Sequence, residues 1–590
     1  MSRIRSQISY YDLTGGLNNV STPDTLNSSP KKTESPDMVN VEFLKLGGIK
    51  SMNGNIQIGD TQTNAIVGGW EYSKGNNKYM IIALKSGAIK RLDQITETFV
   101  EIYQFAHQSD RVSFCNMNNG VVFTNGIDDP VFYEIGRHQI LSGSVDTTQN
   151  STTVTGHSTK FTTELKPGDT VQFGTDTDNT YTIASITSDT NLELTTVFPT
   201  TESSLNMYLS EISACNATLV NENDSNVNTL IRGTAIQYYN GRLWIGTENG
   251  LFYSQVGQYN KWDIKYDAGV IYSVYNDTSE IKALGLYSDY MLIHKEFNTY
   301  LLTCTGAADT IKVIPYSNVS CDSQQSWIVS NTKYYVYSRE NMDIYPLSQR
   351  TIFSDRYLGD AITNKVRNVF QNLREADLDN VFCVALPRKR WMIFYMPMID
   401  QLGSSYGLIF DFQTKSFVVR KVPQTVTIAF NFMNEVYIGT EDGKVLKEFI
   451  GASFDGKPII SYYKSPWFDW AGDYLHSFAE FAIDMAVEYK NKFYIRTFKD
   501  GDSLYEDRII DDNALISSGL IWSGDVHDDN NLTKWDDDVW TSGSFNSIRM
   551  LLPNNVFETF QLEIGTNELG QAFAIYGYNF RRLETEEAVW

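Results

Sequence analysis

The feature that most constrains the fold is a segment that occurs twice. Residues 239–250 read Y-N-G-R-L-W-I-G-T-E-N-G, and residues 432–443 read F-M-N-E-V-Y-I-G-T-E-D-G. Each segment has a polar turn, then alternating apolar residues, then a tight glycine turn after an acidic residue. A strand–turn–strand unit that recurs in one chain is typical of a β-architecture built by repetition, most often a propeller. In this pattern Glu248 and Glu441 are turn residues at strand ends, not catalysts.

The composition favours an all-β chain. Phe, Trp and Tyr make up 13% of the 590 residues and suit half-buried pleated surfaces. Forty glycines, with many Asn, Asp, Ser and Thr residues, supply turns. The hydrophobic content of 42% is enough for large cores, and the length predicts several domains.

The pattern along the chain predicts five parts. Residues 1–60 are polar, dotted with proline and poorly periodic, which predicts an extended arm ordered by packing on something else. Short strands bounded by turn residues indicate propeller segments at 61–137 and 213–454. Residues 138–212 are rich in Thr and Ser and alternate strictly, which predicts a small inserted β-domain. Longer alternating strands predict a C-terminal β-sandwich or platform at 455–590.

One helix is predicted inside the second propeller segment, near 355–373. Ser354 fits as its N-cap, and apolar residues follow at helical spacing: Leu358, Ile362, Val366, Phe370 and Leu373. Such a helix either faces a neighbouring subunit or covers the edge of the propeller.

The net charge of −23, with a pI near 4.7, argues against a protein that grips nucleic acid. Two interpretations remain. The acidity only confers solubility, or it lines a surface that DNA must pass without sticking, because like charges repel at short range. The basic run Pro387-Arg388-Lys389-Arg390 lies between two strand-like segments and is interpreted as a hairpin turn, with phosphate contact as the alternative.

The cysteines and the N-terminus bear on where the chain is made. The five cysteines are far apart, odd in number and without a C-x-x-C pair, so we expect reduced, buried thiols: Cys115, Cys215, Cys304, Cys321 and Cys383. No apolar stretch follows the start M-S-R-I-R-S-Q, and no run of about 18 apolar residues occurs. We therefore expect a soluble chain with no secretory signal and no membrane segment.

Motifs for catalysis are scarce. The six histidines form no H-E-x-x-H or H-x-H pattern, and neither a G-x-S-x-G elbow nor a P-loop occurs. The densest acidic run, Asp525 to Asp538, lacks the spacing of an EF-hand, so a solvated loop is favoured over a calcium site. We predict that the chain is not an enzyme and has no catalytic, cofactor-binding or metal-binding residues. A propeller glycosidase, which needs only two suitably spaced carboxylates, stays open as an alternative.

The order of parts resembles a known family. Residues 10–23 read Y-Y-D-L-T-G-G-L-N-N-V-S-T-P, and residues 37–54 read D-M-V-N-V-E-F-L-K-L-G-G-I-K-S-M-N-G. Together they resemble the N-terminal arm of tail nozzle proteins of short-tailed phages, also called tail tubular protein B or packaged-DNA stabilisation proteins. The threonine-rich insertion resembles small β-domains of phage tail proteins, and the strands at 560–564 and 573–578 are similar to the family's closing strands.

The resemblance implies a structural virion protein, made in the host bacterial cytoplasm and located in the virion tail. It implies a homohexameric tube below an adaptor ring, at the distal end of a short tail. Viral DNA leaves through this channel without specific binding, and the tube closes the channel before infection. Tail fibres or spikes are open as further partners, and the family carries no catalytic residues over to this chain. The alternatives are another neck or tail ring component, such as an adaptor or stopper, or a propeller that binds or degrades glycans.

Overall fold

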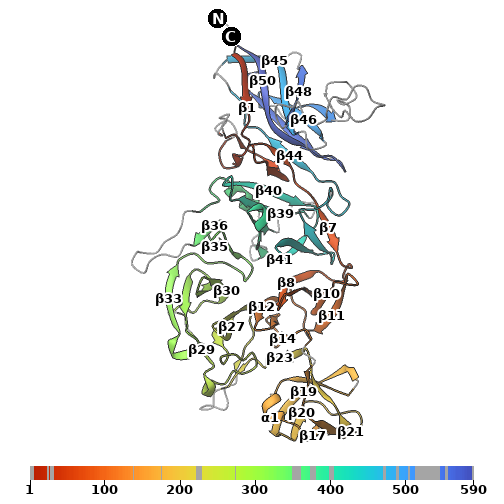
Figure 1. The fold of residues 1–590 in the computed structure, drawn as a ribbon. Coiled ribbons are helices and arrows are strands. Elements are labelled where there is room, and N and C mark those ends of the chain that lie inside the picture. The colour runs from red at the N-terminus through yellow and green to blue at the C-terminus, as the bar shows by residue number, and fades with distance from the viewer. Residues whose placement is uncertain are drawn as a thin grey trace, which may run out of the picture.

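The computed structural model describes most of the chain, namely residues 5–22, 26, 32–136, 139–165, 167–174, 176–220, 229–272, 274, 276–347, 361–372, 380–396, 404–469, 474–486, 491–501, 505–511, 545–551 and 556–587. Strands dominate these residues, and α1 (Phe161–Glu164) is the one α-helix among them, which confirms the predicted all-β class. The ribbon is elongated, with a ring of sheets in the middle and a separate β-unit at each end (Figure 1).

The ring is a propeller, in which seven antiparallel blades follow one another within the described residues. The first strand of each blade is innermost, and neighbouring first strands contact one another, as β8 does β41 and β12 does β26. The blades are: β8 (Ile66–Lys74), β9 (Asn77–Leu84), β10 (Ala88–Asp93) and β11 (Thr98–Gln104); β12 (Ser113–Met117), β13 (Gly120–Thr124), β14 (Val131–Tyr133) and β23 (Ile212–Ala214); β26 (Ala235–Tyr239), β27 (Arg242–Thr247), β28 (Gly250–Tyr253) and β29 (Gly269–Ile271); β30 (Ile281–Tyr287), β31 (Tyr290–Lys295), β32 (Thr299–Thr303) and β33 (Lys312–Ser317); β34 (Trp327–Ser330), β35 (Lys333–Ser338) and β36 (Asp343–Leu347); β37 (Phe382–Leu386), β38 (Trp391–Met396), β39 (Ser405–Asp411) and β40 (Ser416–Val422); and β41 (Val426–Phe432), β42 (Glu435–Thr440), β43 (Val445–Glu448) and β7 (Asn55–Ile58).

The repeated segment occupies equivalent places in the third and seventh blades. In the third blade Asn240 and Gly241, with φ of 46° and 80°, connect β26 to β27. In the seventh blade Met433 and Asn434, with φ of 49° and 61°, connect β41 to β42. Two successive residues at positive φ make the two-residue hairpin that matches the strand twist. The repeat therefore marks the first hairpin of a blade.

The predicted arm closes the ring. Strand β7 pairs antiparallel with β43, so a segment from the N-terminal arm becomes the outer strand of the seventh blade. Other strands of the arm lie in the C-terminal unit: β1 (Arg5–Tyr10) pairs with β50 (Ala574–Glu587), and β5 (Val41–Phe43) pairs with β6 (Ile49–Ser51). The arm thus ties both units together.

A buried ion pair holds this closure. Arg420 on β40 and Glu448 on β43 are both fully buried, with 3.0 Å between Nε and Oε2. Glu448 also accepts hydrogen bonds from Tyr395 Oη at 2.9 Å and Asn55 Nδ2 at 2.8 Å. The Arg420 guanidinium donates to the carbonyl oxygens of residues 53 and 54, just before β7. The pair therefore joins the sixth blade, the seventh blade and the arm.

The C-terminal unit is a β-sandwich of two sheets. One sheet has the order β48 (Phe545–Leu551), β45 (Tyr474–Ala486), β50, β6 and β5, with β1 also on β50. The other continues from β40 of the sixth blade through β4 (Met38–Val39), β44 (Ser461–Lys464), β49 (Phe560–Thr566), β46 (Lys492–Lys499) and β47 (Tyr505–Asp511). Phe478 of the first sheet packs on Phe560 of the second, with ring centroids 5.1 Å apart. One continuous sheet thus links the sandwich to the propeller.

The threonine-rich segment forms its own small unit at the other end of the molecule (Figure 1). The chain leaves the second blade after β14 and returns in β23, where Tyr133 pairs with Ile212. Its core includes Val145, Phe161 and Leu192, and α1 covers part of it. Its strands are β15 (Gln139–Ile140), β16 (Ser144–Thr147), β17 (Thr153–His157), β18 (Thr170–Phe173), β19 (Asp176–Ser188), β20 (Asn191–Leu194), β21 (Glu202–Leu205) and β22 (Met207–Leu209).

Short elements complete the described secondary structure. Strand β2 (Gly16–Leu17) pairs with β3 (Glu34–Ser35), and β24 (Thr218–Leu219) pairs with β25 (Thr229–Leu230). The 3-10 helices are η1 (Ile264–Tyr266), η2 (Ala308–Thr310), η3 (Arg367–Asn372) and η5 (Pro387–Lys389).

The α-helix predicted near 355–373 is wrong for residues 361–372, the part of it that the structure describes. These residues form turns followed by η3, with i→i+3 hydrogen bonds such as Val369 N–H to the Val366 carbonyl. The Thr363 hydroxyl donates to Asp343 and accepts from the Ile344 N–H at 3.1 Å. These contacts hold the segment on β36, so tertiary packing overrides the helical spacing.

We expect Glu448→Gln to loosen the ring closure. The substitution leaves Arg420 buried without its counter-charge, which costs about 3–5 kcal/mol. Amide hydrogen exchange, measured by mass spectrometry on peptides covering β7 and β43, should then accelerate more than ~100-fold. Arg388→Ala is the matched control, because its pair with Glu435 is partly exposed and worth less than about 1 kcal/mol. Exchange in Glu448→Gln within threefold of the wild type would contradict the closing role of the pair.

We expect the stability of the propeller to depend on pH because of His294. It is fully buried between Thr299 Oγ1 and Tyr334 Oη, and burial lowers its pKa to about 3. The unfolded chain takes up this proton near pH 6.5, so stability falls by about 1.4 kcal/mol per pH unit as the pH drops from 6.5 toward 3. His294→Gln should lessen this slope in urea titrations, whereas Tyr334→Phe should keep it. Equal slopes in the wild type and His294→Gln would refute the assignment.

Candidate functional site

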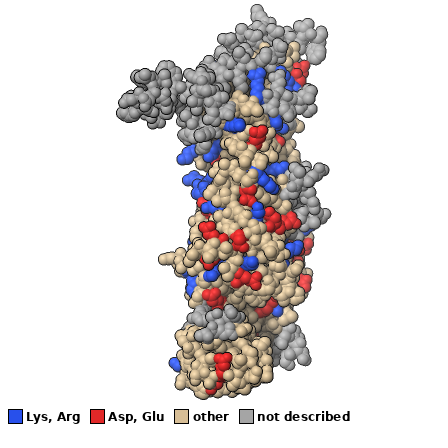
Figure 2. Space-filling model, turned by 90° about the vertical axis from the view of Figure 1, so that its right-hand side faces the viewer, with Lys and Arg blue, Asp and Glu red and all other residues tan. Residues whose placement is uncertain are grey.

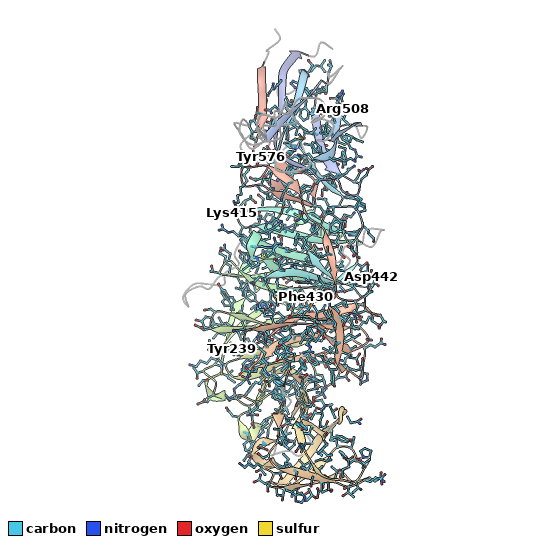
Figure 3. The ribbon with its side chains drawn as sticks, turned by 45° about the vertical axis from the view of Figure 1, so that its right-hand side comes forward. Tyr239, Lys415, Phe430, Asp442, Arg508 and Tyr576 are labelled. Atoms are coloured by element: carbon cyan, nitrogen blue, oxygen red, sulfur yellow. The ribbon has the colours of Figure 1, made fainter. Side chains whose placement is uncertain are left out.

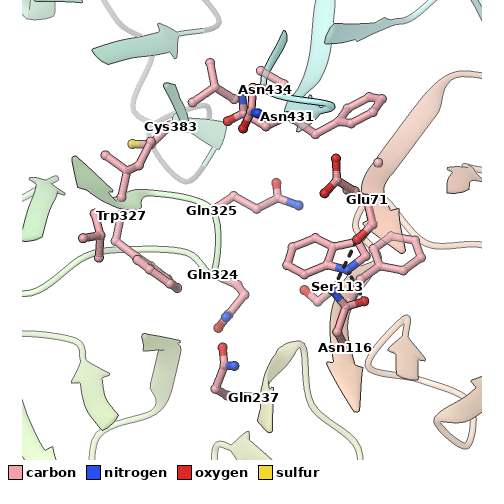
Figure 4. Close-up of a pocket in the computed structure, with 18 residues that line it drawn as sticks. Glu71, Ser113, Asn116, Gln237, Gln324, Gln325, Trp327, Cys383, Asn431 and Asn434 are labelled. Atoms are coloured by element: carbon pink, nitrogen blue, oxygen red, sulfur yellow. Dashed lines mark hydrogen bonds between the residues drawn. The ribbon is translucent and has the colours of Figure 1, made fainter. Parts of the chain in front are cut away.

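A cavity of about 430 Å³ lies on the propeller axis, where the innermost strands converge. Six blades line it, through the first strands β8, β12, β26, β34, β37 and β41 and the segment before β34. Figure 4 shows the labelled polar side chains approaching one another from all sides, and Figure 3 places Phe430 near the middle of the propeller. The lining residues with polar or aromatic side chains are Trp70, Glu71, Ser113, Phe114, Asn116, Gln237, Gln324, Gln325, Trp327, Cys383, Phe430, Asn431 and Asn434.

Exposure grows toward the carboxyl ends of several inner strands, which gives the cavity a floor and a mouth. On β12, Ser113 is buried and Asn116 is exposed. On β41 and its following turn, Phe430 is buried and Asn434 is exposed, and on β34 exposure rises to Val329. The innermost strands run in the same direction around a propeller. The mouth therefore lies at their carboxyl ends and the floor at their amino ends.

A hydrogen bond spans the amino ends of two of these strands. Arg111, just before β12, donates from Nη2 to Asn380 Oδ1 at 2.9 Å, just before β37. These residues belong to the second and sixth blades, which are not neighbours in the ring. The contact therefore crosses part of the axis beside Ser113, at the floor of the cavity.

Two lining amides hold neighbouring blades in place. Gln324 accepts from the Leu284 N–H and donates to the Leu284 carbonyl, both at 2.8 Å, in the manner of a strand partner. Asn431 makes the same pair of bonds to Ala385, accepting from its N–H at 3.1 Å and donating to its carbonyl at 2.6 Å. These two side chains are structural, because their polar atoms complete the backbone bonding of inner strands.

The cavity has little free charge. Glu71 is the one ionisable carboxylate among its lining residues, and no Lys or Arg is among them. Its Oε1 accepts from Lys78 Nζ and its Oε2 from the Met433 N–H, each at 2.6 Å. With a single, engaged carboxylate, the cavity does not supply the pair that glycoside hydrolysis uses.

Three lining atoms have no hydrogen-bond partner within the protein: Ser113 Oγ, Gln325 Oε1 and Trp327 Nε1. Ser113 is only 1% exposed. The Trp327 ring is held by stacking on Tyr334, with centroids 5.1 Å apart and planes 9° from parallel. All three atoms are buried in the protein around the cavity.

The repeat glutamates lie away from this cavity. Glu248 sits in the two-residue turn between β27 and β28, where Thr247 pairs with Gly250, and Glu441 follows β42 in the corresponding turn. Glu248 and Glu280 line a second, polar cavity of about 380 Å³ near Arg232. Arg232 is paired with Asp129 at 3.0 Å. The turn positions predicted for both glutamates are confirmed.

The basic run forms the turn between β37 and β38, within η5, with Arg390 at φ 57°. Lys389 pairs with Glu42 of the arm and lies over the Trp391 ring, and Arg388 pairs with Glu435. Two of its three charges are thus engaged by carboxylates, which favours the turn over a phosphate site. The acidic run Asp525 to Asp538 lies outside the described residues.

The predicted thiols are unpaired. Cys115, Cys215, Cys304 and Cys321 are buried, and Cys383 is partly buried at the cavity. In the described ranges no group of three or more His, Cys, Asp or Glu residues is placed to hold a metal ion. Among the same residues, no helix has the length and apolarity needed to cross a membrane.

Sequence reasoning missed the cavity. Its unpartnered groups come from strands more than 200 residues apart, Ser113 on β12 and the segment Gln325–Trp327 at β34. The local signal is the polar stretch S-Q-Q-S-W at 323–327 immediately before a strand, and it carries no motif spacing. Only the closure of the ring brings these groups together.

No protein-family model matches the chain, and no curated protein matches it. Similar solved structures include BamB from Moraxella catarrhalis, with 12% identity, a TM-score of 0.32, and coverage of 70% of this chain and 94% of that chain. The WD40 β-propeller domain of Doa1 has 9% identity, a TM-score of 0.31, and coverage of 68% and 96%. Phage phi92 endosialidase has 10% identity, a TM-score of 0.26, and coverage of 88% and 70%. At these values the likenesses carry no argument about function.

We expect Cys383 to react slowly with iodoacetamide although it borders the cavity. Burial raises the pKa of its thiol well above the ordinary value, so the nucleophilic thiolate is scarce at pH 8. Peptide mass spectrometry should show little alkylation in the native protein and complete alkylation in guanidinium chloride. Native alkylation as fast as that of the denatured chain would show an open, ionised thiol instead.

Proposed function

We propose that the chain is a structural virion protein, the nozzle at the distal end of a short phage tail. In this role it forms the channel for genome ejection and closes it before infection. The observation that carries the proposal is the arrangement of the units. A propeller stands between a sandwich and an inserted β-unit, and the N-terminal arm runs back through both the sandwich and the propeller. This arrangement matches the order of parts in the tail nozzle family that the sequence resembles.

The proposed role accounts for the net negative charge of the chain. A channel with excess carboxylates repels phosphates, so that DNA slides through instead of binding. The inserted unit at one end of the molecule is strongly acidic, and Lys160 and Lys166 are the only Lys or Arg residues in 138–212. On the face shown in Figure 2, by contrast, acidic and basic side chains are interspersed. A mixed surface of this kind suits contact with a neighbouring subunit.

An exposed apolar group on the third blade supports contacts between subunits. Ile264 and Tyr266 of η1 are 42% and 58% exposed, and Val220 beside them is 39% exposed. The Ile264 N–H donates to the Val220 carbonyl, so these side chains share one site on the surface. Apolar residues grouped at a surface mark interaction sites more often than isolated ones.

The purified protein is expected to form a six-fold ring with a central pore. Native mass spectrometry would give the subunit number, and electron microscopy of negatively stained particles would show the pore. Tyr266→Asp should shift the population toward monomers, because it places a charge in the proposed contact. Ile95→Asp is the matched control, since Ile95 is 93% exposed at the tip of the β10–β11 turn.

Assembly alone does not separate a nozzle from another ring of the tail. Labelling the protein on intact virions with antibody-bound gold should place it at the distal end of the tail. A monomer at all concentrations, or a ring located at the neck, would overturn the proposal.

A further inference from the structure

The inserted unit has a hydrophobic core of its own, built from residues such as Val154, Ile183 and Leu194. Among the described residues, this core shares no member with the cores of the first three blades. The insert lies beside β14 and β23, the strands through which the chain enters and leaves it (Figure 1). Units with separate cores move relative to each other unless a large apolar interface joins them.

The two chain crossings between the insert and the propeller form a narrow neck. The Glu134 N–H, after β14, donates to the Glu211 carbonyl, before β23, at 2.8 Å. The Gly136 N–H donates to the Glu211 carboxylate. The crossings are therefore tied to each other, and contacts beside the neck decide the position in which the insert is held.

The connection between β28 and β29 of the third blade provides such a contact. Tyr259 Oη, in this connection, donates to Asp169 Oδ1 of the insert at 3.2 Å. Asp169 is only 4% exposed and directly precedes β18, the strand of the insert that lies against β23. Gly168 lies against the Asn216 side chain, where a Cβ would come within 1.6 Å of Nδ2. The insert is thus seated on the propeller at Gly168 and Asp169.

The same connection is anchored on both strands that lead to the neck. The Tyr259 ring stacks on Phe132 of β14, with centroids 4.2 Å apart and planes 7° from parallel. Trp262 Nε1 donates to the carbonyl of Cys215, the residue after β23, at 3.1 Å. Stacking fixes the Tyr259 ring before its hydroxyl meets the insert, so little side-chain freedom is lost in making the contact.

We propose that Tyr259 is a latch that holds the inserted unit in one position against the propeller. When the latch opens, the insert swings about the neck formed by Glu134, Gly136 and Glu211, and both units keep their folds. A typical hydrogen bond of this kind changes an equilibrium only about 2- to 10-fold, so the latch opens readily. The inference is independent of the proposed assembly, because all these residues belong to one subunit.

Electron cryo-microscopy of the full-length protein tests the latch directly. In the wild type the insert should occupy a single position relative to the propeller. Tyr259→Ala removes both the hydrogen bond and the stack on Phe132, so the insert should spread over several positions while the propeller stays unchanged. Tyr259→Phe keeps the stack and removes only the hydroxyl. Its amide hydrogen exchange, measured on peptides covering β18, should be about 2- to 10-fold faster than in the wild type.

Tyr238→Phe is the matched control. Tyr238 Oη donates to Asn118 Oδ1 at 3.0 Å, a contact between the third and second blades that does not involve the insert. This variant should keep the wild-type position of the insert and the wild-type exchange of β18. If Tyr259→Ala unfolds the insert, shown by fast exchange throughout β16 to β20, the result for Tyr259→Phe decides. The proposal is overturned if a folded insert keeps one position in Tyr259→Ala, or if β18 exchanges equally fast in Tyr259→Phe and Tyr238→Phe. An insert that already takes many positions in the wild type would overturn it too.

Discussion

The closure of the ring by the N-terminal arm is the constraint on which the rest of the structure depends. The outer strand of the seventh blade is β7, which directly precedes β8 of the first blade in sequence, so the chain itself connects the last blade to the first. The Arg420–Glu448 pair fixes that junction from inside, and Asn55 of β7 bonds to the same carboxylate. A buried pair of this kind gains little net stability over an apolar one, but breaking one half is costly. The pair therefore serves mainly to favour this closure of the ring over alternative pairings of the seventh blade.

The N-terminal arm also connects the propeller to the C-terminal sandwich. Strand β4 of the arm lies between β40 of the sixth blade and β44 of the sandwich, so one sheet passes from the propeller into the end unit. Glu42 of the arm adds a contact to Lys389 of the β37–β38 turn. Because the arm contributes to both units, their relative position is set by sheet pairing and not by a flexible linker.

Local patterns predicted local structure well. The short, turn-bounded strands predicted within 61–137 and 213–454 are found there, and both copies of the repeat form blade hairpins. The helix near 355–373 failed in the described residues because helical spacing also arises where Val366 and Phe370 pack from turns and a 3-10 helix. The pairing between the arm and the seventh blade could not be predicted. The residues of β7 carry no signal that identifies β43, almost 400 residues away, as the strand with which it pairs. The axial cavity was missed for the same reason.

The position of the insertion shows how such a fold acquires new units without losing its cavity. The chain departs between β14 and β23, the two outer strands of the second blade, and these strands still pair after a detour of more than 70 residues. Loop closure becomes only slowly more costly with length, so a unit with its own core is tolerated there. An insertion in an inner strand, by contrast, would displace residues such as Ser113 that face the axis. The outer strands and blade connections therefore tolerate such additions, while the inner strands keep the geometry of the cavity.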